Sequence, residues 1–105
     1  MASSPVSRSL KVMRERGYRA QVVERRVPYT NTTLDLFGII DIVCVGKGET
    51  IGIQATSGSN VASRIAKIED SDALADLREA GWKVVVHGWR KNAKGRWQLR
   101  EEDIS

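Results

Sequence analysis

Two polar side chains inside apolar segments are the residues best placed to do chemistry. Asp41 lies in the apolar run 37–45, and Gln54 lies in the run 50–56. A buried carboxylate without a partner carries a desolvation cost of several kcal/mol, so such a residue is usually paired, hydrogen-bonded or bound to a metal. Gln54 and Thr56 alternate onto one side of their predicted strand, where both can converge with Asp41. Oxygen atoms from two neighbouring strands, completed by water, can hold Mg²⁺.

Two further carboxylates could complete this oxygen-lined site. Asp35 lies six residues before Asp41, and Glu24 lies on the preceding predicted strand. Each could be a second metal ligand or a general base. Asp35 could instead cap the loop before the apolar run, and Glu24, next to Arg25 and Arg26, could be a solvated strand residue.

The nature of the metal follows from the ligands that the sequence lacks. The single His87 and the single Cys44 exclude a zinc site built from four nitrogen and sulfur ligands. A lone cysteine forms no internal disulfide, and Cys44 in an apolar run is typical of a small buried side chain. We therefore expect Mg²⁺, or Mn²⁺, held by oxygens. The candidate ligands are Asp41, Gln54, Asp35 and Glu24.

Hydrophobic spacing and turn residues predict the elements that position these side chains. The turn Gly46-Lys47-Gly48-Glu49 joins the two apolar runs into a hairpin, and their near-continuous apolar character indicates that helices cover both faces of the sheet. Ser7 is expected to cap the first helix, and residues 29–33 to form a polar loop. The expected elements are helix 8–16, strands 18–27, 37–45 and 50–56, helix 61–80 with a break near 69–72, and strands 82–89 and 96–99.

This αβββαββ order predicts an α/β fold with a central mixed β-sheet flanked by helices. Residues 7–105 are long enough for one domain with a single core, after a flexible tail over residues 1–6.

The charge favours an anionic partner. The 105 residues carry a net charge of +4, and basic side chains gather over residues 8–19 and 90–100. Lys and Arg that neutralise phosphates release counterions, so the pattern favours nucleic acid. No apolar stretch is long enough to span a bilayer, and residues 1–5 lack the pattern of a signal peptide. We expect a cytoplasmic protein, in the host cytoplasm if it is phage-encoded, with no membrane partner.

Three segments could contact nucleic acid. Residues 30–33 and 57–60 offer hydroxyls, amides and backbone N–H groups to phosphates, and residues 87–91 combine an aromatic ring with two cations. The same segments could be ordinary loops with a tryptophan packed into the sheet, and His87 could be a catalytic base. The candidate nucleic-acid-binding residues are Asn31, Thr32, Ser57, Asn60, Arg64, Trp89, Arg90 and Lys91.

At Ile40-Asp41 and Gln54-Ala55-Thr56 the chain resembles the PD-(D/E)XK nuclease superfamily, in which an Asp is followed on the next strand by an (Asp/Glu)-X-Lys triplet. The segment Asp35-Leu36-Phe37-Gly38, together with Asp41, also looks like small phage and archaeal nucleases of the Holliday-junction-resolvase and VRR-NUC kind. The resemblance covers about residues 7–90. It implies a restriction-endonuclease-like core and a metal-dependent DNA endonuclease that acts on branched or structured DNA as a homodimer, without an organic cofactor.

The chain departs from the family pattern at two positions. Gln54 stands in place of the acidic residue and offers only a neutral carbonyl oxygen, and Thr56 stands in place of the lysine that steadies the developing negative charge. Lys67 or Arg64, on the helix after Thr56, could supply that cation, and Lys67 could equally be an exposed helix residue. The resemblance then implies a catalytic set of Asp41, Gln54, Thr56 and Lys67.

Two other functions compete with an endonuclease. A catalytically decayed nucleic-acid-binding module of the same fold is one, because Gln54 and Thr56 are changes that would disable the site. The other is a structural or interaction protein that uses its basic face against a different anionic surface.

Overall fold

The computed structural model describes residues 4–30 and 32–105, and the strands of the protein form two sheets. The strands are β1 (Arg19–Val22), β2 (Arg25–Val27), β3 (Thr32–Leu34), β4 (Ile42–Gly46), β5 (Glu49–Ser57), β6 (Lys83–Lys91) and β7 (Trp97–Asp103). The larger sheet has five strands in the order β1-β4-β5-β6-β7, and the smaller one pairs β2 with β3. β5 and β6 are parallel, whereas the other pairs are antiparallel, so the sheet is mixed.

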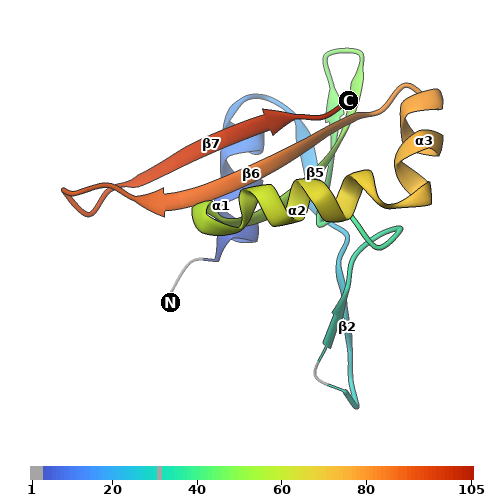
Figure 1. The fold of residues 1–105 in the computed structure, drawn as a ribbon. Coiled ribbons are helices and arrows are strands. Elements are labelled where there is room, and N and C mark those ends of the chain that lie inside the picture. Colours follow the sequence, from blue (N-terminus) through green and yellow to red (C-terminus); the bar gives the residue numbers. More distant parts are fainter. Residues whose placement is uncertain (1–3, 31) are drawn as a thin grey trace.

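Helices cover both faces of the larger sheet (Figure 1). They are α1 (Pro5–Glu15), the short 3₁₀ turn η1 (Gly58–Asn60), α2 (Val61–Glu69) and α3 (Asp72–Glu79). On the α1 face, Met13 packs with Ile42 and Ile53 of the hairpin, and on the α2–α3 face Ile68 packs with Val86. The predicted α/β fold, with a central mixed sheet flanked by helices, is therefore confirmed at this level.

The β4–β5 hairpin forms where the sequence predicted it. Gly46 pairs with Glu49, which leaves Lys47 and Gly48 as a two-residue loop. Both loop residues have positive φ, 54° and 75°, as a type I′ turn requires, and glycine adopts this conformation without a steric penalty. Because the register is fixed by this tight turn, the polar positions of β4 and β5 are fixed relative to one another.

A glycine on β6 allows α2 to approach the sheet closely. A Cβ atom on Gly88 would lie 2.3 Å from Cγ2 of Val61, the first residue of α2, so Val61 or the helix that carries it would have to shift. The contact places the first two turns of α2, with Arg64 and Lys67, beside the polar positions of β5.

The first helix begins earlier than predicted. It starts at Pro5 with Ser4 as its N-cap, and Ser7 is the third helical residue rather than the cap. The Ser4 hydroxyl accepts the Ser7 N–H at 3.1 Å and the Ser7 hydroxyl accepts the Ser4 N–H at 2.8 Å, a reciprocal capping box. The predicted tail over residues 1–6 is thus wrong at positions 5 and 6, and residues 1–3 lie outside the described residues.

The predicted break in the second helical segment is confirmed. α2 ends at Glu69, and α3 begins at Asp72 after Ser71, whose hydroxyl accepts the Ala73 N–H at 3.2 Å. Among the described residues, no helix is long and apolar enough to cross a membrane.

The segment predicted as one strand over 18–27 forms two strands in different sheets. The chain leaves the main sheet after β1, where the Val23 N–H donates to the Asp41 carbonyl at 2.8 Å. β2 then pairs with β3, which lies in the segment predicted as a polar loop over 29–33. The main-chain turn after Pro28 folds these two strands onto one another, so polar threonines serve as strand residues with both faces open to solvent.

Two other strand boundaries differ from the prediction. Residues 37–39 form a turn, with Phe37 and Gly38 at positive φ of 55° and 77° and a bridge between Leu36 and Ile40, so β4 begins only at Ile42. β7 was predicted to end at residue 99 but continues to Asp103, because it pairs along most of β6.

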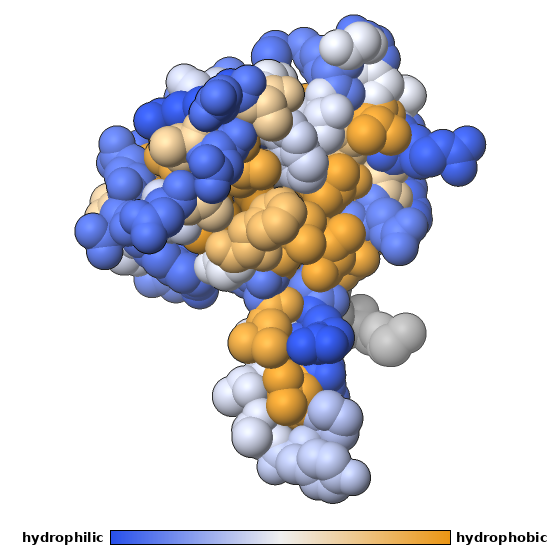
Figure 2. Space-filling view, turned by 90° about the vertical axis from the view of Figure 1, so that its right-hand side faces the viewer, coloured by the Kyte–Doolittle hydropathy of each residue, from blue (hydrophilic) through white to orange (hydrophobic). Residues whose placement is uncertain are grey.

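β2 and β3 form an arm, residues 25–34, that projects from the body of the molecule (Figures 1 and 2). Its strands pair Arg25 with Leu34, Arg26 with Thr33 and Val27 with Thr32. Glu24 immediately precedes the arm and Asp35 immediately follows it, so both ends of the arm enter the body at the same place.

Candidate metal site

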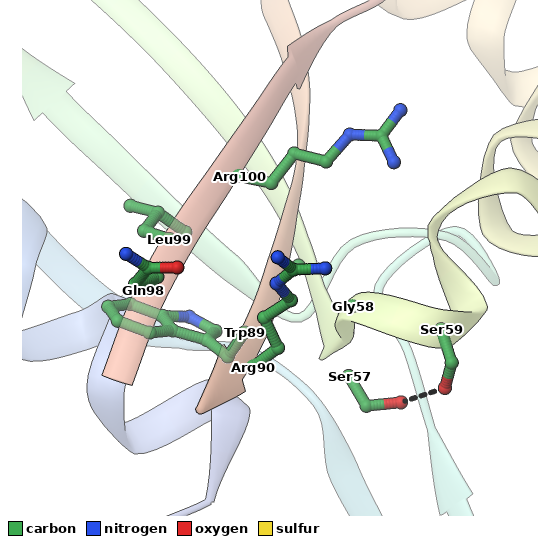
Figure 3. Close-up of a pocket in the computed structure, with 9 residues that line it drawn as sticks. Ser57, Gly58, Ser59, Trp89, Arg90, Gln98, Leu99 and Arg100 are labelled. Carbon is green, nitrogen blue, oxygen red and sulfur yellow. Dashed lines mark hydrogen bonds between the residues drawn. The ribbon is translucent and has the colours of Figure 1, made fainter. Parts of the chain in front are cut away.

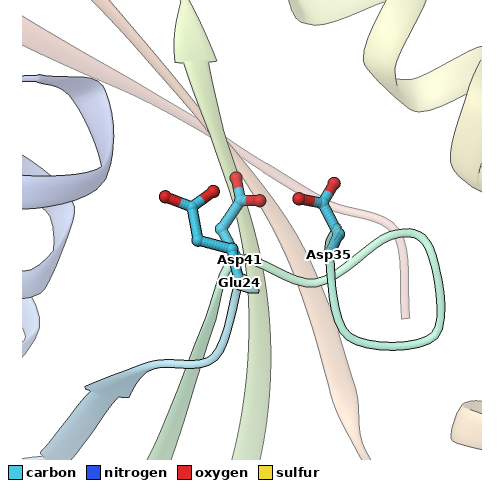
Figure 4. Close-up of side chains that lie close together, drawn as sticks. All are labelled: Glu24, Asp35 and Asp41. Atoms are coloured by element: carbon cyan, nitrogen blue, oxygen red, sulfur yellow. The ribbon is translucent and has the colours of Figure 1, made fainter. Parts of the chain in front are cut away.

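Three carboxylates from separate segments meet beside β5 (Figure 4). Glu24 and Asp35 flank the arm, and Asp41 immediately precedes β4. One carboxylate oxygen from each lies within 4.8 Å of the other two. These are the acidic residues that the sequence proposed as ligands, and the fold brings all of them together.

Asp41 is the buried member of the cluster, with 3 % of its surface exposed. Its Oδ2 accepts the backbone N–H of Ala55 at 2.9 Å and the side-chain amide of Gln54 at 2.6 Å. The Gln54 Nε2 also lies 3.4 Å from Oδ2 of Asp35, so the amide bridges two carboxylates. Both donors come from β5, and they fix the Asp41 carboxylate in one orientation.

Burial and mutual repulsion make it unfavourable for all three carboxylates of the cluster to be ionised at once. The pKa of Asp41 is raised from 3.8 to about 7, chiefly by burial and then by the hydrogen bond with Asp35 and its negative charge, while the Ala55 and Gln54 hydrogen bonds oppose the rise. Burial and the charge of Asp35 also raise the pKa of Glu24. A cation would relieve both effects, because it favours the ionised form of each carboxylate and displaces their protons.

The second end of the Gln54 amide has no partner. Gln54 is only 2 % exposed, and its Oε1 accepts no hydrogen bond from the described residues. A buried carbonyl left unsatisfied costs about 1–3 kcal/mol. Rotation of the amide would direct this oxygen at Asp41 and Asp35, where an oxygen is favourable when a cation lies between them. Gln54 therefore carries an unused ligand atom.

Two basic residues of α2 complete the site. Lys67 Nζ lies 3.6 Å from Asp35 Oδ2, and Arg64 lies beside the same opening. We call this opening the acidic recess; it has a volume of about 260 Å³ and is lined by Val6, Glu24, Thr33, Asp35, Asp41, Gln54, Ala55, Arg64 and Lys67. Thr56 does not line it: this residue is buried further along β5, although it shares the face of Gln54.

Several predicted nucleic-acid contacts lie in a second opening, the basic groove (Figure 3). This groove has a volume of about 860 Å³ and runs between η1 and the β6–β7 ribbon. Its lining residues are Ser57, Gly58, Ser59, Gly88, Trp89, Arg90, Gln98, Leu99 and Arg100. The groove and the acidic recess lie at the same end of β5, about 10 Å apart if Gln54 and Ser57 are taken as their positions on the strand.

Sequence reasoning missed Gln98 and Arg100. Antiparallel pairing places Arg100 opposite Gly88 and Gln98 opposite Arg90, so these side chains share the face of the groove. A longer final strand, with its turn at residues 92–95, would have revealed this pairing. The predicted strand ends concealed it: the end at residue 89 leaves out Arg90, the partner of Gln98, and the end at residue 99 leaves out Arg100.

The remaining predicted contacts do not gather in one place. Thr32 lies on the arm, Asn60 donates to the Ser57 hydroxyl at 3.0 Å, and Lys91 lies over the Trp97 ring at 5.2 Å. Asn31 lies outside the described residues.

His87 pairs with Ala55 across the β5–β6 ladder, but its side chain lies on the α1 face of the sheet and does not reach the acidic recess. Its Nδ1 lies 2.8 Å from the buried Ser9 hydroxyl and its Nε2 lies 3.0 Å from Oε1 of Glu101. Trp89 Nε1 donates to the same Ser9 hydroxyl at 2.8 Å. Burial lowers the pKa of His87 to about 4, against the opposing effect of Glu101. His87 does not line the recess. The Trp89 indole is buried and hydrogen-bonded to Ser9, as the alternative of a tryptophan packed into the sheet predicts.

Comparison of the chain with protein-family models, with curated proteins and with solved structures finds no match.

Proposed function

We propose that the protein is a divalent-cation-dependent DNA endonuclease, with the acidic recess as its catalytic site. The observation that carries the proposal is the combination of three converging carboxylates with a buried, unpartnered carbonyl oxygen on Gln54. Carboxylate and amide oxygens are the ligands that Mg²⁺ and Mn²⁺ prefer. The raised pKa of Asp41 further supports a site whose charge is meant to be matched by an ion.

Each residue of the recess has a distinct part in this chemistry. The Ala55 N–H holds Asp41 so that its second oxygen can face a cation, and Asp35 and the Gln54 carbonyl supply further ligand atoms. When bound, the cation would polarise the scissile phosphate and lower the pKa of a coordinated water. Glu24 lies at the edge of the cluster, half-buried, where it can accept the proton that the attacking water loses.

Lys67 provides the positive charge that Thr56, which stands at the position of the family's triplet lysine, lacks. In the structure the Lys67 ammonium forms an ion pair with Asp35. When Asp35 turns to a metal ion, the ammonium is free to contact the oxygen of a bound phosphate. This arrangement supports the similarity to PD-(D/E)XK nucleases while replacing the triplet lysine with one from the following helix.

The basic groove offers a path for the DNA strand beyond the cleaved bond. Arg90 and Arg100 face the groove together with the hydroxyls of Ser57 and Ser59 (Figure 3). Such groups contact phosphates without reading sequence. We therefore propose that the protein recognises its DNA substrate by a branched or otherwise distorted shape rather than by a short sequence motif.

A nucleic-acid-binding module without catalytic activity is the second candidate. Two observations favour it: Gln54 brings no negative charge to the recess, and Lys67 is already ion-paired with Asp35. Weak cation binding at the recess would leave the basic groove as the functional surface.

A cleavage assay separates these functions. Purified protein is incubated with Mg²⁺ or Mn²⁺ and with linear, flapped and four-way DNA of shared sequence. We expect cutting of the branched substrates, loss of cutting in Asp41→Ala with binding retained, and a drop of at least tenfold in Lys67→Ala. Binding without cutting in either metal would favour the inactive module, and the absence of any salt-sensitive binding would exclude both. Unchanged cutting by Lys67→Ala would remove this residue from the mechanism.

The proposed homodimer has a candidate surface. Phe37, 57 % exposed, lies edge-on to Trp82 at 6.4 Å, beside an apolar hollow lined also by Ala73, Leu77 and Ala80. Figure 2 shows apolar side chains gathered on this face of the body, above the arm. Light scattering of the wild type and of Phe37→Ser would test the prediction: a dimer that the substitution converts to a monomer supports it.

A further inference from the structure

We propose that the β2–β3 arm is the element that selects distorted DNA, with Tyr29 at its tip stacking on an unpaired base. The inference rests on the proposed nuclease function and adds to it a recognition element and a distance between the distortion and the cut. Three features of the arm carry it: its exposed tip, its charge and its attachment to the acidic recess.

The tip of the arm presents an aromatic ring to solvent. Tyr29 is 99 % exposed, the most exposed of the large apolar side chains among the described residues. It follows Pro28 in the turn between the two strands, where the projecting arm holds it away from the body (Figure 1). An uncovered ring costs solvation without contributing to the core, and the faces of unpaired bases are its natural stacking partners.

The charge of the arm matches a nucleic acid. Residues 25–34 include two arginines, Arg25 and Arg26, and no acidic residue, and four of the other eight residues are threonine or asparagine. Both arginines are exposed. On the face that Figure 2 shows, apolar side chains lie at the base and along the middle of the arm, and its end is coloured as polar. A tip that bound a protein surface would be expected to carry apolar side chains continuous with that base.

One face of the arm leads directly into the acidic recess. Thr33 lines the recess and pairs across the arm with Arg26, so their side chains share a face that begins at Glu24 and Asp35. A strand that enters the recess can therefore continue along this face with its phosphates near Arg26. The two ends of the arm also carry two of the three carboxylates, so a shift of the arm on DNA would move the metal ligands themselves.

The length of the arm sets where the distortion must lie. Three strand residues separate Glu24 from the start of the turn, which places Tyr29 on the order of 10–15 Å from the recess. Base pairs stack every 3.4 Å along a duplex, so the contacted base lies about three or four steps from the cleaved phosphate. A small two-stranded arm is only marginally stable alone, and DNA would order it at the moment of binding.

Binding measurements in an Asp41→Ala background test the arm without interference from cleavage. Dissociation constants are measured for a four-way junction and for a linear duplex of the same sequence. We expect Tyr29→Ala to weaken junction binding at least tenfold and duplex binding less than twofold, and Tyr29→Phe to restore junction binding. Trp97→Ala removes another exposed ring, on β7, and is expected to change the junction and duplex dissociation constants by the same factor. A 2-aminopurine placed three or four steps from the cut should be quenched by the protein and not by its Tyr29→Ala form.

Each result bears on a different claim. Equal losses for junction and duplex, or no loss for either, would overturn the role of Tyr29. A change in the oligomer mass of Tyr29→Ala would assign the arm to a second copy of the chain and also overturn it. Absence of cleavage by the wild type in Mg²⁺ and Mn²⁺ would reject the nuclease function, whereas the binding comparison would still report on the arm.

Discussion

Two clusters of buried polar side chains lie against the larger sheet, and they differ in whether each buried polar atom has a hydrogen-bond partner. Near α1, the Ser9, His87 and Trp89 side chains form a closed network that ends on Glu101. The indole N–H can only donate, so the Ser9 oxygen accepts it, the Ser9 hydroxyl donates to Nδ1, and the Nε2–H donates to Glu101. Each of these polar atoms has a partner, and Arg16 neutralises the far end through Glu101 at 2.5 Å.

The acidic recess has the opposite character. Asp41 is held at a raised pKa, and the Gln54 Oε1 is buried without a partner. Both clusters contain a buried titratable group, and each group has a strongly shifted pKa. Burial and a shifted pKa therefore do not distinguish a structural network from a ligand site here. What distinguishes the recess is a buried polar atom without a partner, a cost that an ion at the proposed site would remove.

Breaking the closed network should have the largest effect on stability. His87→Ala removes a ring that is 1 % exposed, leaves the buried Ser9 hydroxyl without an acceptor for its proton, and takes from Glu101 one of its two partners. We expect the free energy of unfolding to fall by about 4 kcal/mol, from the cavity and the unsatisfied groups together. Urea denaturation measures the loss. Mg²⁺ affinity, measured by calorimetry, should change less than twofold, and a loss of affinity with little loss of stability would reverse the roles of the two clusters.

The two clusters should respond to pH in opposite directions. The pKa of His87 is lowered from 6.5 to about 4, so stability is full above pH 6.5 and falls as pH drops toward 4. The pKa of Asp41 is raised from 3.8 to about 7, so in the absence of metal its contribution is full below pH 3.8 and is lost as pH rises toward 7. Each effect is on the order of 3 kcal/mol, and they largely cancel between pH 4 and 6.5.

Single substitutions should unmask each pH dependence. Asp41→Asn leaves the His87 effect, so its stability should decline toward acid. His87→Asn keeps an acceptor for Ser9 and removes the titration, so its stability should decline toward alkali. Denaturation curves at pH 4.5, 5.5 and 6.5 provide the comparison. Parallel profiles for the two variants would contradict the assignment.

Replacing the charge at the recess should stabilise the metal-free protein. In Asp41→Asn, the amide oxygen can accept the Ala55 N–H, and its NH₂ group faces the remaining carboxylates. We expect a gain of about 2 kcal/mol at pH 8 without metal, because a disfavoured negative charge is removed. Mg²⁺ should no longer raise the melting temperature. A destabilised variant would show instead that the carboxylate is part of the structure, as His87 is.

The sequence predicted which side chains meet at the recess better than it predicted the path of the chain that brings them there. Asp41 and Gln54 stand out because an apolar context makes each polar residue expensive, and the type I′ turn fixes the pairing of their strands. Lys67 follows from helical spacing after β5. These inferences depend on local patterns and on tight turns, which are encoded within a few residues.

The arm and the closed network depend on pairings that local patterns do not encode. Threonines and arginines in β2 and β3 have no buried face, so their alternation carries no hydrophobic signal. Ser9 and His87 are 78 residues apart and meet only because α1 packs across β6. The sequence does not decide between a metal ligand and a solvated residue for Glu24, because the proximity of Glu24 to Asp41 depends on the chain leaving the main sheet at Val23.

The smallest expected effect comes from adding a negative charge to the recess at Gln54. In Gln54→Glu a carboxylate replaces the amide that donates to Asp41 and Asp35, so the metal-free protein should lose stability at pH 8. Mg²⁺ should then bind about tenfold more tightly, because the new oxygen carries a full charge and can serve as a ligand. Calorimetry gives the affinity, and thermal denaturation with and without Mg²⁺ gives the stabilisation.

Gln98→Glu adds the same charge at an exposed position on β7 and should leave Mg²⁺ affinity within twofold. If Gln54→Glu lowered stability without tightening Mg²⁺ binding, the amide of Gln54 would belong with Ser9 and His87 as a structural hydrogen-bonding group. The unpartnered Oε1 would then be a tolerated defect, and the difference between the two clusters would no longer identify the site.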